Sequence, residues 1–170
     1  YIVLPAHARK LHPKVQDRMT GLEEYACDTP VNEIQLRSKD LGIVTSGAAY
    51  QYVREACPEA SVLKLGLSYP VPTALIRRFA EQVDRLVVVE ELEPLLEDHI
   101  RGMGLEVTGK VLFSRFGEFN TEIVSQGLSM VVQASGEATA AKAAALDGAS
   151  PTEASGSATP AAEAPAAGKA

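Results

Sequence analysis

Cysteine is scarce and long apolar runs are absent in this 170-residue sequence, and each shortage excludes a class of protein. The two cysteines, Cys27 and Cys57, are too few for a disulfide framework and too far apart for a CxxC metal site, so we expect reduced thiols. No apolar run approaches the roughly 20 residues of a membrane-spanning helix, and the N-terminus lacks a signal-peptide layout. We therefore expect a soluble, cytoplasmic protein with no membrane partner.

Basic residues are also in deficit. The 16 Lys and Arg are outnumbered by 22 Asp and Glu, which gives a net charge of −6. Binding to nucleic acid needs clustered Lys and Arg to replace counterions, so we expect no nucleic-acid partner. The chain begins at Tyr1 rather than Met, which predicts a piece of a longer polypeptide.

Aromatic residues are confined to the first 119 positions. All nine, five Tyr and four Phe, lie between Tyr1 and Phe119. Residues 135–170 consist largely of Ala, Gly, Ser, Thr and Pro, and cannot bury enough surface to offset the entropy of ordering. We predict that they form a disordered linker or tail.

Three short apolar runs predict buried strands. They are Leu41–Thr45, Val62–Leu65 and Leu86–Val89, and each is apolar almost throughout, as expected where helices cover both faces of a parallel sheet. Glu106–Phe113 suggests a fourth strand, interrupted at Gly109 and lying at an edge.

Helical periodicity follows each of these runs. One helix carries Ala49, Tyr52, Val53 and Ala56 and stops before Pro58. A second spans about Pro72–Val83. A third buries one side, with Glu91 and Glu93 in its first turn and Gly104 just past its end; the buried side comprises Leu92, Leu95, Leu96, Ile100 and Met103. Asn120 resembles the N-cap of a last helix through about Val131, with Ile123 among its inward residues.

The resulting domain organisation has three parts. Residues 1–38, including a weakly amphipathic helix over Pro13–Tyr25, are predicted to be a connector from an upstream domain. Residues 39–134 are predicted to form the α/β domain, and 135–170 the tail.

The first candidate site is the turn Thr45-Ser46-Gly47, which opens a helix after a buried strand. Backbone N–H groups and the helix dipole could hold an anion there. The plainer interpretation is that Ser46 caps the helix and Gly47 permits close packing, because the turn lacks a full phosphate-binding motif.

The second candidate is the pair Glu90 and Glu91, at the carboxyl edge of the sheet. Two carboxylates could serve acid–base chemistry, but a capping or interface role is the plainer interpretation. His7 and His12 would not share a helix face, so we expect no metal site there.

Four blocks of sequence, in order, carry a resemblance to a known family. They are GIVTSGAAYQYVREA, SVLKLGLSYPVP, LIRRFAEQVDRLVVVEELEPLLEDHIRGMG and GEFNTEIV. Together they closely resemble the second domain of the indolepyruvate:ferredoxin oxidoreductase alpha subunit. The opening YIVLPAHARKLHPKVQDRM and the segment TPVNEI are similar to the connector of that subunit.

The resemblance implies a transketolase C-terminal-like fold: a three-layer sandwich with a small, mostly parallel sheet, helices on both faces and one antiparallel edge strand. For the parent enzyme it implies thiamine diphosphate, Mg²⁺ and 4Fe–4S clusters, a beta subunit, and ferredoxin as electron acceptor. The diphosphate-binding Gly-Asp-Gly and the cysteine sets of that family are absent from these residues.

We therefore expect a non-catalytic structural domain of a 2-oxoacid:ferredoxin oxidoreductase that acts on aryl pyruvates. It would contact the other domains through exposed apolar residues near Tyr69-Pro70-Val71-Pro72, and the isolated chain would be inactive. Two alternatives stay open: a regulatory module that binds a small ligand or anion, and the C-terminal domain of a transketolase or pyruvate dehydrogenase beta chain.

Overall fold

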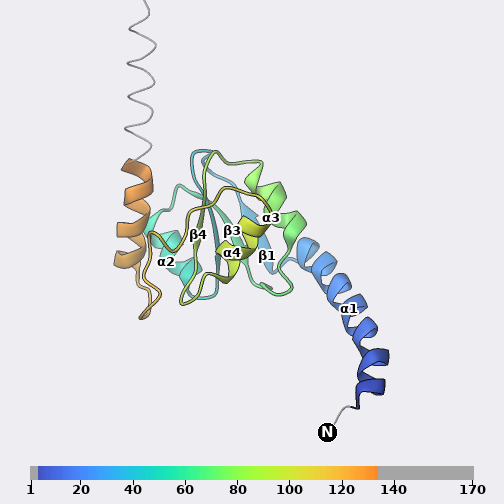
Figure 1. Cartoon of the computed structure of the whole chain (residues 1–170). Helices are drawn as coiled ribbons and strands as arrows, with labels where there is room; N and C mark the ends of the chain where they lie inside the picture. The colour runs from blue at the N-terminus through green and yellow to red at the C-terminus, as the bar shows by residue number, and fades with distance from the viewer. Residues whose placement is uncertain (1–3, 134–170) are drawn as a thin grey trace, which may run out of the picture. The chain divides into compact units, whose positions relative to one another are not determined.

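The computed structural model describes residues 4–133, which belong to one compact unit. Residues 135–170, the predicted tail, lie outside the described residues. Figure 1 shows the central sheet, whose four strands have the order β1-β3-β2-β4. Its strands are β1 (Asn32–Gln35), β2 (Gly42–Ser46), β3 (Ser61–Leu65) and β4 (Leu86–Val89).

β2, β3 and β4 are parallel. Between each strand and the next, a helix returns the chain to the edge of the sheet where the strands begin. β2 pairs in parallel with both β3 and β4. The helices are α2 (Ala49–Ala56), α3 (Thr73–Ala80), α4 (Leu95–Gly102) and a last helix over 121–133. The three predicted buried strands are thus confirmed to within a residue.

Alternate residues of each strand enter two separate cores, one on each face of the sheet. Ile43, Val62 and Val87 pack with α2 and the 121–133 helix. Val44 and Leu63 pack with α3 and α4. Helices cover both faces, which confirms the predicted three-layer fold.

The antiparallel edge strand exists, but at a different place in the chain from the one suggested. β1 pairs antiparallel with β3, with Asn32 opposite Leu65. The predicted boundary between residues 38 and 39 falls after β1, although β1 belongs to the same sheet as the strands that follow it. The suggested strand Glu106–Phe113 is also wrong: only Thr108 forms a bridge, parallel to Val87, before the chain turns at Lys110.

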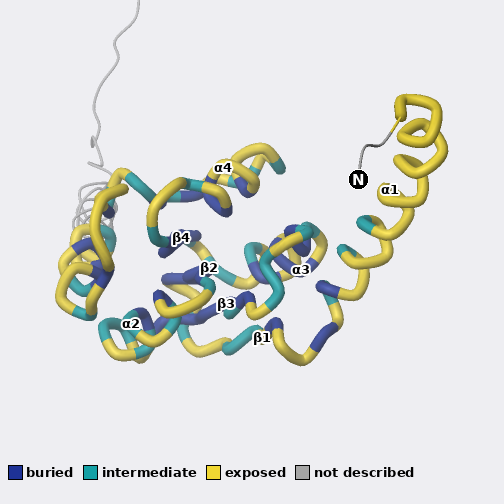
Figure 2. Tube along the Cα trace, turned by 90° about the horizontal axis from the view of Figure 1, so that it is seen from below, coloured by how far each residue is buried: buried dark blue, intermediate teal, exposed yellow. Residues whose placement is uncertain are grey.

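α1 (Pro5–Asp28) precedes the sheet and is longer than the predicted helix. Only Ala26, in its last turn, is fully buried, and Figure 2 shows α1 exposed along most of its length. Asn32 fixes this turn to the sheet, since its amide donates to the carbonyls of Ala26 and Leu67 at 2.7 and 3.0 Å and accepts from the Leu67 N–H. Within residues 4–133, no helix is both long and apolar enough to cross a membrane.

Some helix details differ from the sequence-based predictions. α4 begins only at Leu95, so Glu91 and Glu93 precede it instead of forming its first turn. Leu92 and Leu95, predicted to be buried, are 62% and 60% exposed, because the chain between β4 and α4 loops away from the core. Ile123 is also exposed, because the 121–133 helix buries Val124 and Leu128 instead.

Candidate functional site at the carboxyl edge of the sheet

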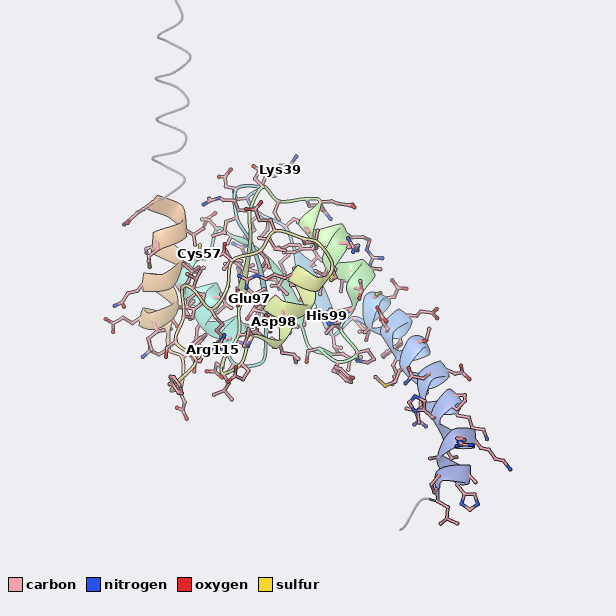
Figure 3. The ribbon with its side chains drawn as sticks, in the orientation of Figure 1. Lys39, Cys57, Glu97, Asp98, His99 and Arg115 are labelled. Atoms are coloured by element: carbon pink, nitrogen blue, oxygen red, sulfur yellow. The ribbon has the colours of Figure 1, made fainter. Side chains whose placement is uncertain are left out.

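The two predicted site segments lie side by side at the carboxyl edge, because the neighbouring strands β2 and β4 are parallel. Thr45 is in register with Val89, the last residue of β4. Its hydroxyl donates to the Val89 carbonyl at 2.8 Å and is fully buried. Figure 3 shows Lys39, which precedes β2, at the opposite edge from Arg115.

The interpretation of Ser46 and Gly47 as a helix cap needs correction. The N-cap of α2 is Ala48, and no side chain caps that helix. A Cβ on Gly47 would meet nothing within 4 Å, so close packing does not explain this glycine. The backbone at Gly47 has φ of 60°, a left-handed conformation that glycine adopts at little cost.

Glu90 is buried and holds the start of α4. Its two carboxylate oxygens accept the backbone N–H groups of Leu96 and Glu97 at 2.9 and 3.0 Å. Burial raises the pKa of Glu90, while these two hydrogen bonds and nearby Lys110 act in the opposite direction. The capping interpretation of Glu90 is confirmed. Glu90 directly follows β4, however, and does not belong to the first turn of α4.

Glu91 has a different role from its neighbour. Its carboxylate accepts the backbone N–H of Phe119 at 3.0 Å, so it holds the loop that precedes the 121–133 helix. The two adjacent acids therefore bind different segments of the chain, and they do not form a carboxylate pair.

Lys110 and Glu97 complete the network and were not predicted. The Lys110 Nζ donates to the Glu90 carbonyl and lies 5.2 Å from the centre of the Phe119 ring. Burial lowers the pKa of Lys110, against the opposing charges of Glu90 and Glu97. In the sequence, nothing near Lys110 indicates a partner 20 residues away.

Glu97 is only 2% exposed, yet it is on α4. Its Oε2 accepts the Lys110 backbone N–H at 2.7 Å, and its Oε1 lies 2.6 Å from Arg101 Nη2. The i,i+4 spacing of Glu97 and Arg101 is visible in the sequence and could have indicated this ion pair.

Exposed apolar side chains are found on the segments that follow the sheet strands. Tyr69, Leu92, Val111 and Phe116 are on loops that follow β3, β4 or the bridged Thr108, Leu95 is the first residue of α4, and each of the five is at least 60% exposed. We call these five residues the carboxyl-edge patch. As predicted, Tyr69 is exposed, but Val71 and Pro72 are buried. A shallow groove of about 560 Å³ is lined in part by Leu95, the one member of the patch that it includes, and by His99 and Arg115.

Leu92 is the most unusual member of the carboxyl-edge patch. Its φ of 57° lies in the left-handed region, which a leucine adopts only at a cost of about 1–2 kcal/mol. An exposed apolar side chain on a strained backbone is unfavourable in an isolated domain, and such strain accumulates at functional positions.

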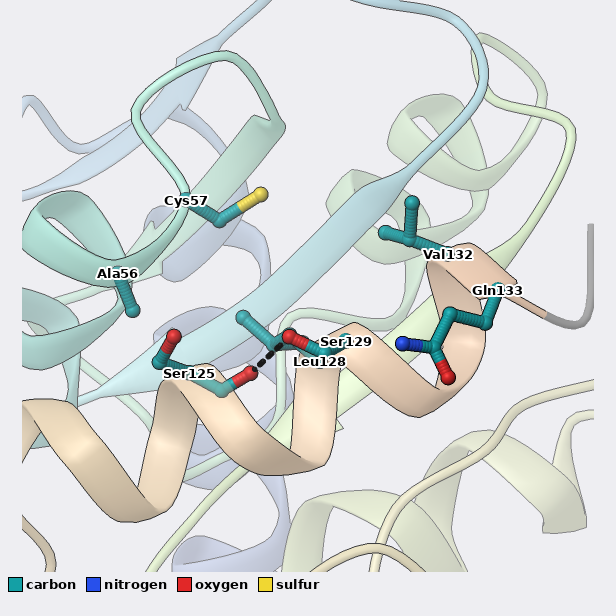
Figure 4. Close-up of a pocket in the computed structure, with 7 residues that line it drawn as sticks. All are labelled: Ala56, Cys57, Ser125, Leu128, Ser129, Val132 and Gln133. Carbon is teal, nitrogen blue, oxygen red and sulfur yellow. Dashed lines mark hydrogen bonds between the residues drawn. The ribbon is translucent and has the colours of Figure 1, made fainter. Parts of the chain in front are cut away.

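A second hollow, of about 220 Å³, lies between the end of α2 and the 121–133 helix (Figure 4). Cys57 lines it beside Ala56 and Leu128, and the Ser129 hydroxyl donates to the Ser125 carbonyl at 2.7 Å. Among residues 4–133, no basic side chain lines this hollow, so none of them is placed there to activate the thiol.

The polar side chains at the carboxyl edge form hydrogen bonds with backbone groups of the same chain. Glu90, Glu91 and Glu97 bind N–H groups of this chain, and Lys110 binds a carbonyl. Among residues 4–133, no three His, Cys, Asp or Glu side chains are grouped so as to hold a metal ion. The arrangement can fix two loops and present the carboxyl-edge patch.

No family model matches the chain. It is 40% identical over 115 residues to "Indolepyruvate oxidoreductase subunit IorA" of Archaeoglobus fulgidus, which covers 65% of this chain and 18% of that protein. It is 33% identical over 143 residues to the IorA of Methanothermobacter thermautotrophicus, covering 76% and 23%. For the IorA of Thermococcus kodakarensis the identity is 32% over 133 residues, covering 71% and 21%.

A solved structure has a similar fold. It is a 2-oxoglutarate:ferredoxin oxidoreductase from Magnetococcus marinus, with a TM-score of 0.58 and 19% identity over 76% of this chain and 24% of that one. The chain thus spans about a fifth of the length of the curated relatives it matches.

Proposed function

From the premise that this chain is similar to one segment of the indolepyruvate oxidoreductase IorA subunits, we propose that it is a non-catalytic structural domain of a 2-oxoacid:ferredoxin oxidoreductase that acts on aryl pyruvates. The similarity to IorA at 40% identity over 115 residues carries the proposal. The carboxyl-edge patch supports it, because exposed apolar groups on a fixed edge are suited to contact other domains.

The cofactors implied for the parent enzyme are thiamine diphosphate, Mg²⁺ and 4Fe–4S clusters, and the residues of this chain do not fit them. The acids at the carboxyl edge already bind backbone N–H groups. Cys27 and Cys57 pack against the cores on opposite faces of the sheet, so they cannot ligate one cluster. We therefore assign the cofactors, and the catalytic residues, to other parts of the parent.

The partners that we propose are the other domains of an alpha subunit, a beta subunit, and ferredoxin for the whole enzyme. We also propose a cytoplasmic location, which the reduced state expected of Cys27 and Cys57 supports.

A domain exchange tests this proposal. The matching segment of the Archaeoglobus fulgidus IorA would be replaced by residues 1–134 of this chain, and indolepyruvate oxidation would be measured after assembly with its partner subunit. We expect activity in the chimera and none in this chain alone. Tight binding of thiamine diphosphate with Mg²⁺ by this chain alone, measured by calorimetry, would contradict the proposal.

Substitution of Leu92 tests whether the carboxyl-edge patch contributes to assembly. Leu92→Gly relieves the left-handed backbone, so the unfolding free energy of this chain should rise by about 1 kcal/mol. The same change removes an apolar contact from the carboxyl-edge patch, and we expect the chimera to assemble less well. Lys39→Gly, at the opposite edge of the sheet, is the matched control and should leave assembly unchanged.

A second candidate function, the anion-binding module, gains no support from the geometry. Thr45 is buried and bonded to Val89, and the carboxylate of Glu90 lies at the same edge, where it would repel an anion.

A further inference from the structure

Within residues 4–133, strand β1 is paired on one side only. It lies at one end of the sheet order, and Figure 2 shows no helix beyond it. The N–H and C=O groups on such an edge can pair with a further strand. Asn32–Gln35 contains no proline, the residue that would prevent this pairing. The outer side of β1 is therefore open to a partner.

The hydrogen bonds of β1 fix which of its backbone groups point outward. The Gly66 N–H donates to the Val31 carbonyl at 3.2 Å, and Val31 is opposite Gly66 when the β1–β3 register is continued by one residue. Val31 therefore faces β3. Further along, the Arg37 N–H donates to the Ser61 hydroxyl at 2.8 Å, so Arg37 also faces the sheet. Because backbone groups alternate between the two sides of a strand, the odd-numbered residues of this segment all face the sheet.

The outward backbone groups belong to Ile34 and Leu36. In the part of the chain that the structure describes, no group accepts a hydrogen bond from either N–H. Their side chains share one face of the sheet, because the side chains of a strand alternate as well. Ile34 packs against the core that α3 and α4 cover, whereas Leu36 is 53% exposed. An apolar side chain on a partner strand could cover Leu36.

Glu33 and Arg37 carry opposite charges on the other face. Gln35 lies between them, and its amide donates to the Tyr50 hydroxyl of α2 at 2.9 Å, so all three side chains are on the α2 face. Glu33 and Arg37 are exposed, and neither forms an ion pair within residues 4–133. The edge thus presents one acid and one base, two positions either side of Gln35.

We propose that β1 pairs antiparallel with β1 of a second copy of this chain, about a two-fold axis through Gln35. Ile34 of one copy is then opposite Leu36 of the other, and the two residues exchange both of their N–H···O=C bonds. Glu33 is opposite the other copy's Arg37, in the position where facing side chains are closest. The axis repeats each of these pairs, and each Leu36 side chain lies beside an Ile34.

The two registers with an axis nearer the start of β1 are less favourable. An axis through Glu33 places two like charges directly opposite each other, which is destabilising. An axis through Ile34 places Glu33 opposite Gln35, so no opposite charges meet. That register also needs the Asn32 N–H, which already donates to the Thr29 carbonyl at 3.1 Å.

The register with an axis through Leu36 is excluded by the end of the extended segment. It would need the backbone of Ser38 to face outward. The Ser38 carbonyl instead accepts the Ser61 hydroxyl at 2.6 Å, so the alternation stops there. The register about Gln35 is therefore the one that bonds the outward groups and pairs the charges.

The occupant is a second copy because the edge is complementary to itself. When β1 is reversed, it brings Arg37 to Glu33 and Leu36 to Ile34. On the other side of Glu33 lies Lys64 of β3, so each Glu33 would lie between two bases. No like charges become neighbours. Two-fold association is also the commonest form among identical chains.

Sedimentation velocity and amide exchange test the pairing in the full 170-residue chain. The wild-type chain should form a dimer as its concentration rises. In hydrogen exchange followed by NMR, the Ile34 and Leu36 N–H groups should then exchange about tenfold more slowly or less. The Glu33 and Gln35 N–H groups face β3 in monomer and dimer alike, so their exchange should not respond to the pairing.

Leu36→Pro removes an outward donor and leaves the bonds between β1 and β3 in place. It should raise the dissociation constant about tenfold or more, because each copy loses one N–H that the pair requires. Circular dichroism should show that this variant is folded.

Charge reversal tests the register. Arg37→Glu and Glu33→Lys should each raise the dissociation constant about tenfold, because two attractive pairs become two repulsive ones. An equimolar mixture of these two variants should form dimers again, since both facing pairs are then of opposite charge. The double variant Glu33→Lys/Arg37→Glu should dimerise by itself for the same reason.

Lys10→Glu is the matched control for Arg37→Glu, because it changes the net charge by the same amount at an exposed position on α1. It should dimerise as the wild-type chain does. A wild-type chain that stays monomeric at every concentration would overturn the proposal and leave the outer side of β1 to another part of a longer protein. So would a dimer in which Ile34 and Leu36 exchange is unchanged, or a mixture that associates no better than its components.

Discussion

The backbone N–H of Glu97 donates a 3.0 Å hydrogen bond to Oε1 of Glu90, so the carboxylate of one buried acid is bonded directly to the backbone of the other. Glu90 directly follows β4, and Glu97 belongs to α4. Because the carboxylate of Glu97 in turn accepts the Lys110 N–H, the two bonds together connect three segments of the chain. The predictions below concern the groups around it.

Glu90→Gln should lower the unfolding free energy by about 1–2 kcal/mol at neutral pH. Gln supplies one acceptor oxygen in place of two, so either the Leu96 or the Glu97 N–H would lose its partner. Urea denaturation measures the change. Glu93→Gln is the control: Glu93 is exposed and makes only a surface ion pair with Arg115, so a cost of less than about 0.5 kcal/mol is expected.

The stability that Glu90 contributes should depend on pH. Burial raises the folded-state pKa of Glu90 above the ordinary 4.5. Between pH 4.5 and that folded-state pKa, the folded chain therefore holds more protons than the unfolded one. This contribution is fully present below pH 4.5 and declines as pH rises through the folded-state pKa. The unfolding free energy of wild type minus that of Glu90→Gln should therefore shrink as pH rises. A difference that grows instead would show that the two backbone hydrogen bonds outweigh burial.

Gly109→Ala should destabilise the chain by about 1–3 kcal/mol. A Cβ at this position would lie 2.4 Å from Oε2 of Glu97, whose carboxylate is fixed by Lys110 and Arg101. Thermal and chemical unfolding both report the loss. Gly102→Ala, at the end of α4, meets nothing within 4 Å and should be neutral or slightly stabilising. Equal effects at the two glycines would show that the Glu97 carboxylate can move aside.

Asn32→Asp should cost about 3 kcal/mol or more, because a carboxylate oxygen would face the carbonyls of Ala26 and Leu67 in a buried site. Asn32→Ala should cost less, since it removes the bonds without adding a charge. Glu33→Ala, exposed on the same strand, should change the unfolding free energy by less than about 0.5 kcal/mol. An Asp variant as stable as wild type would refute the role of Asn32 in joining α1 to the sheet.

The two expected helix caps should behave differently. Asn120→Ala should cost about 1 kcal/mol, because the Asn120 side chain accepts the Ile123 N–H at 2.8 Å. Ser46→Ala should cost less than about 0.5 kcal/mol, because no side chain caps α2. If Ser46→Ala were as costly as Asn120→Ala, the result would support the interpretation that Ser46 caps α2.

Local patterns were sufficient for much of the fold. β4 was predicted with its observed bounds, α2 was placed correctly, and Asn120 was recognised as a cap. Each depends on neighbours within one or two turns of chain: an apolar run, a helical stripe, or a side chain that bonds three residues ahead.

The sequence by itself thus determined the strands, most helices, the layered class and the resemblance to the IorA subunits. Only the tertiary structure decided that Asn32–Gln35 is an edge strand. Ile34 is the one apolar residue among these four, and they form a strand because they pair with β3. The tertiary structure likewise decided the bonds among Glu90, Glu97 and Lys110. Burial and hydrogen bonding between residues far apart in the chain depend on packing, and no local periodicity records them.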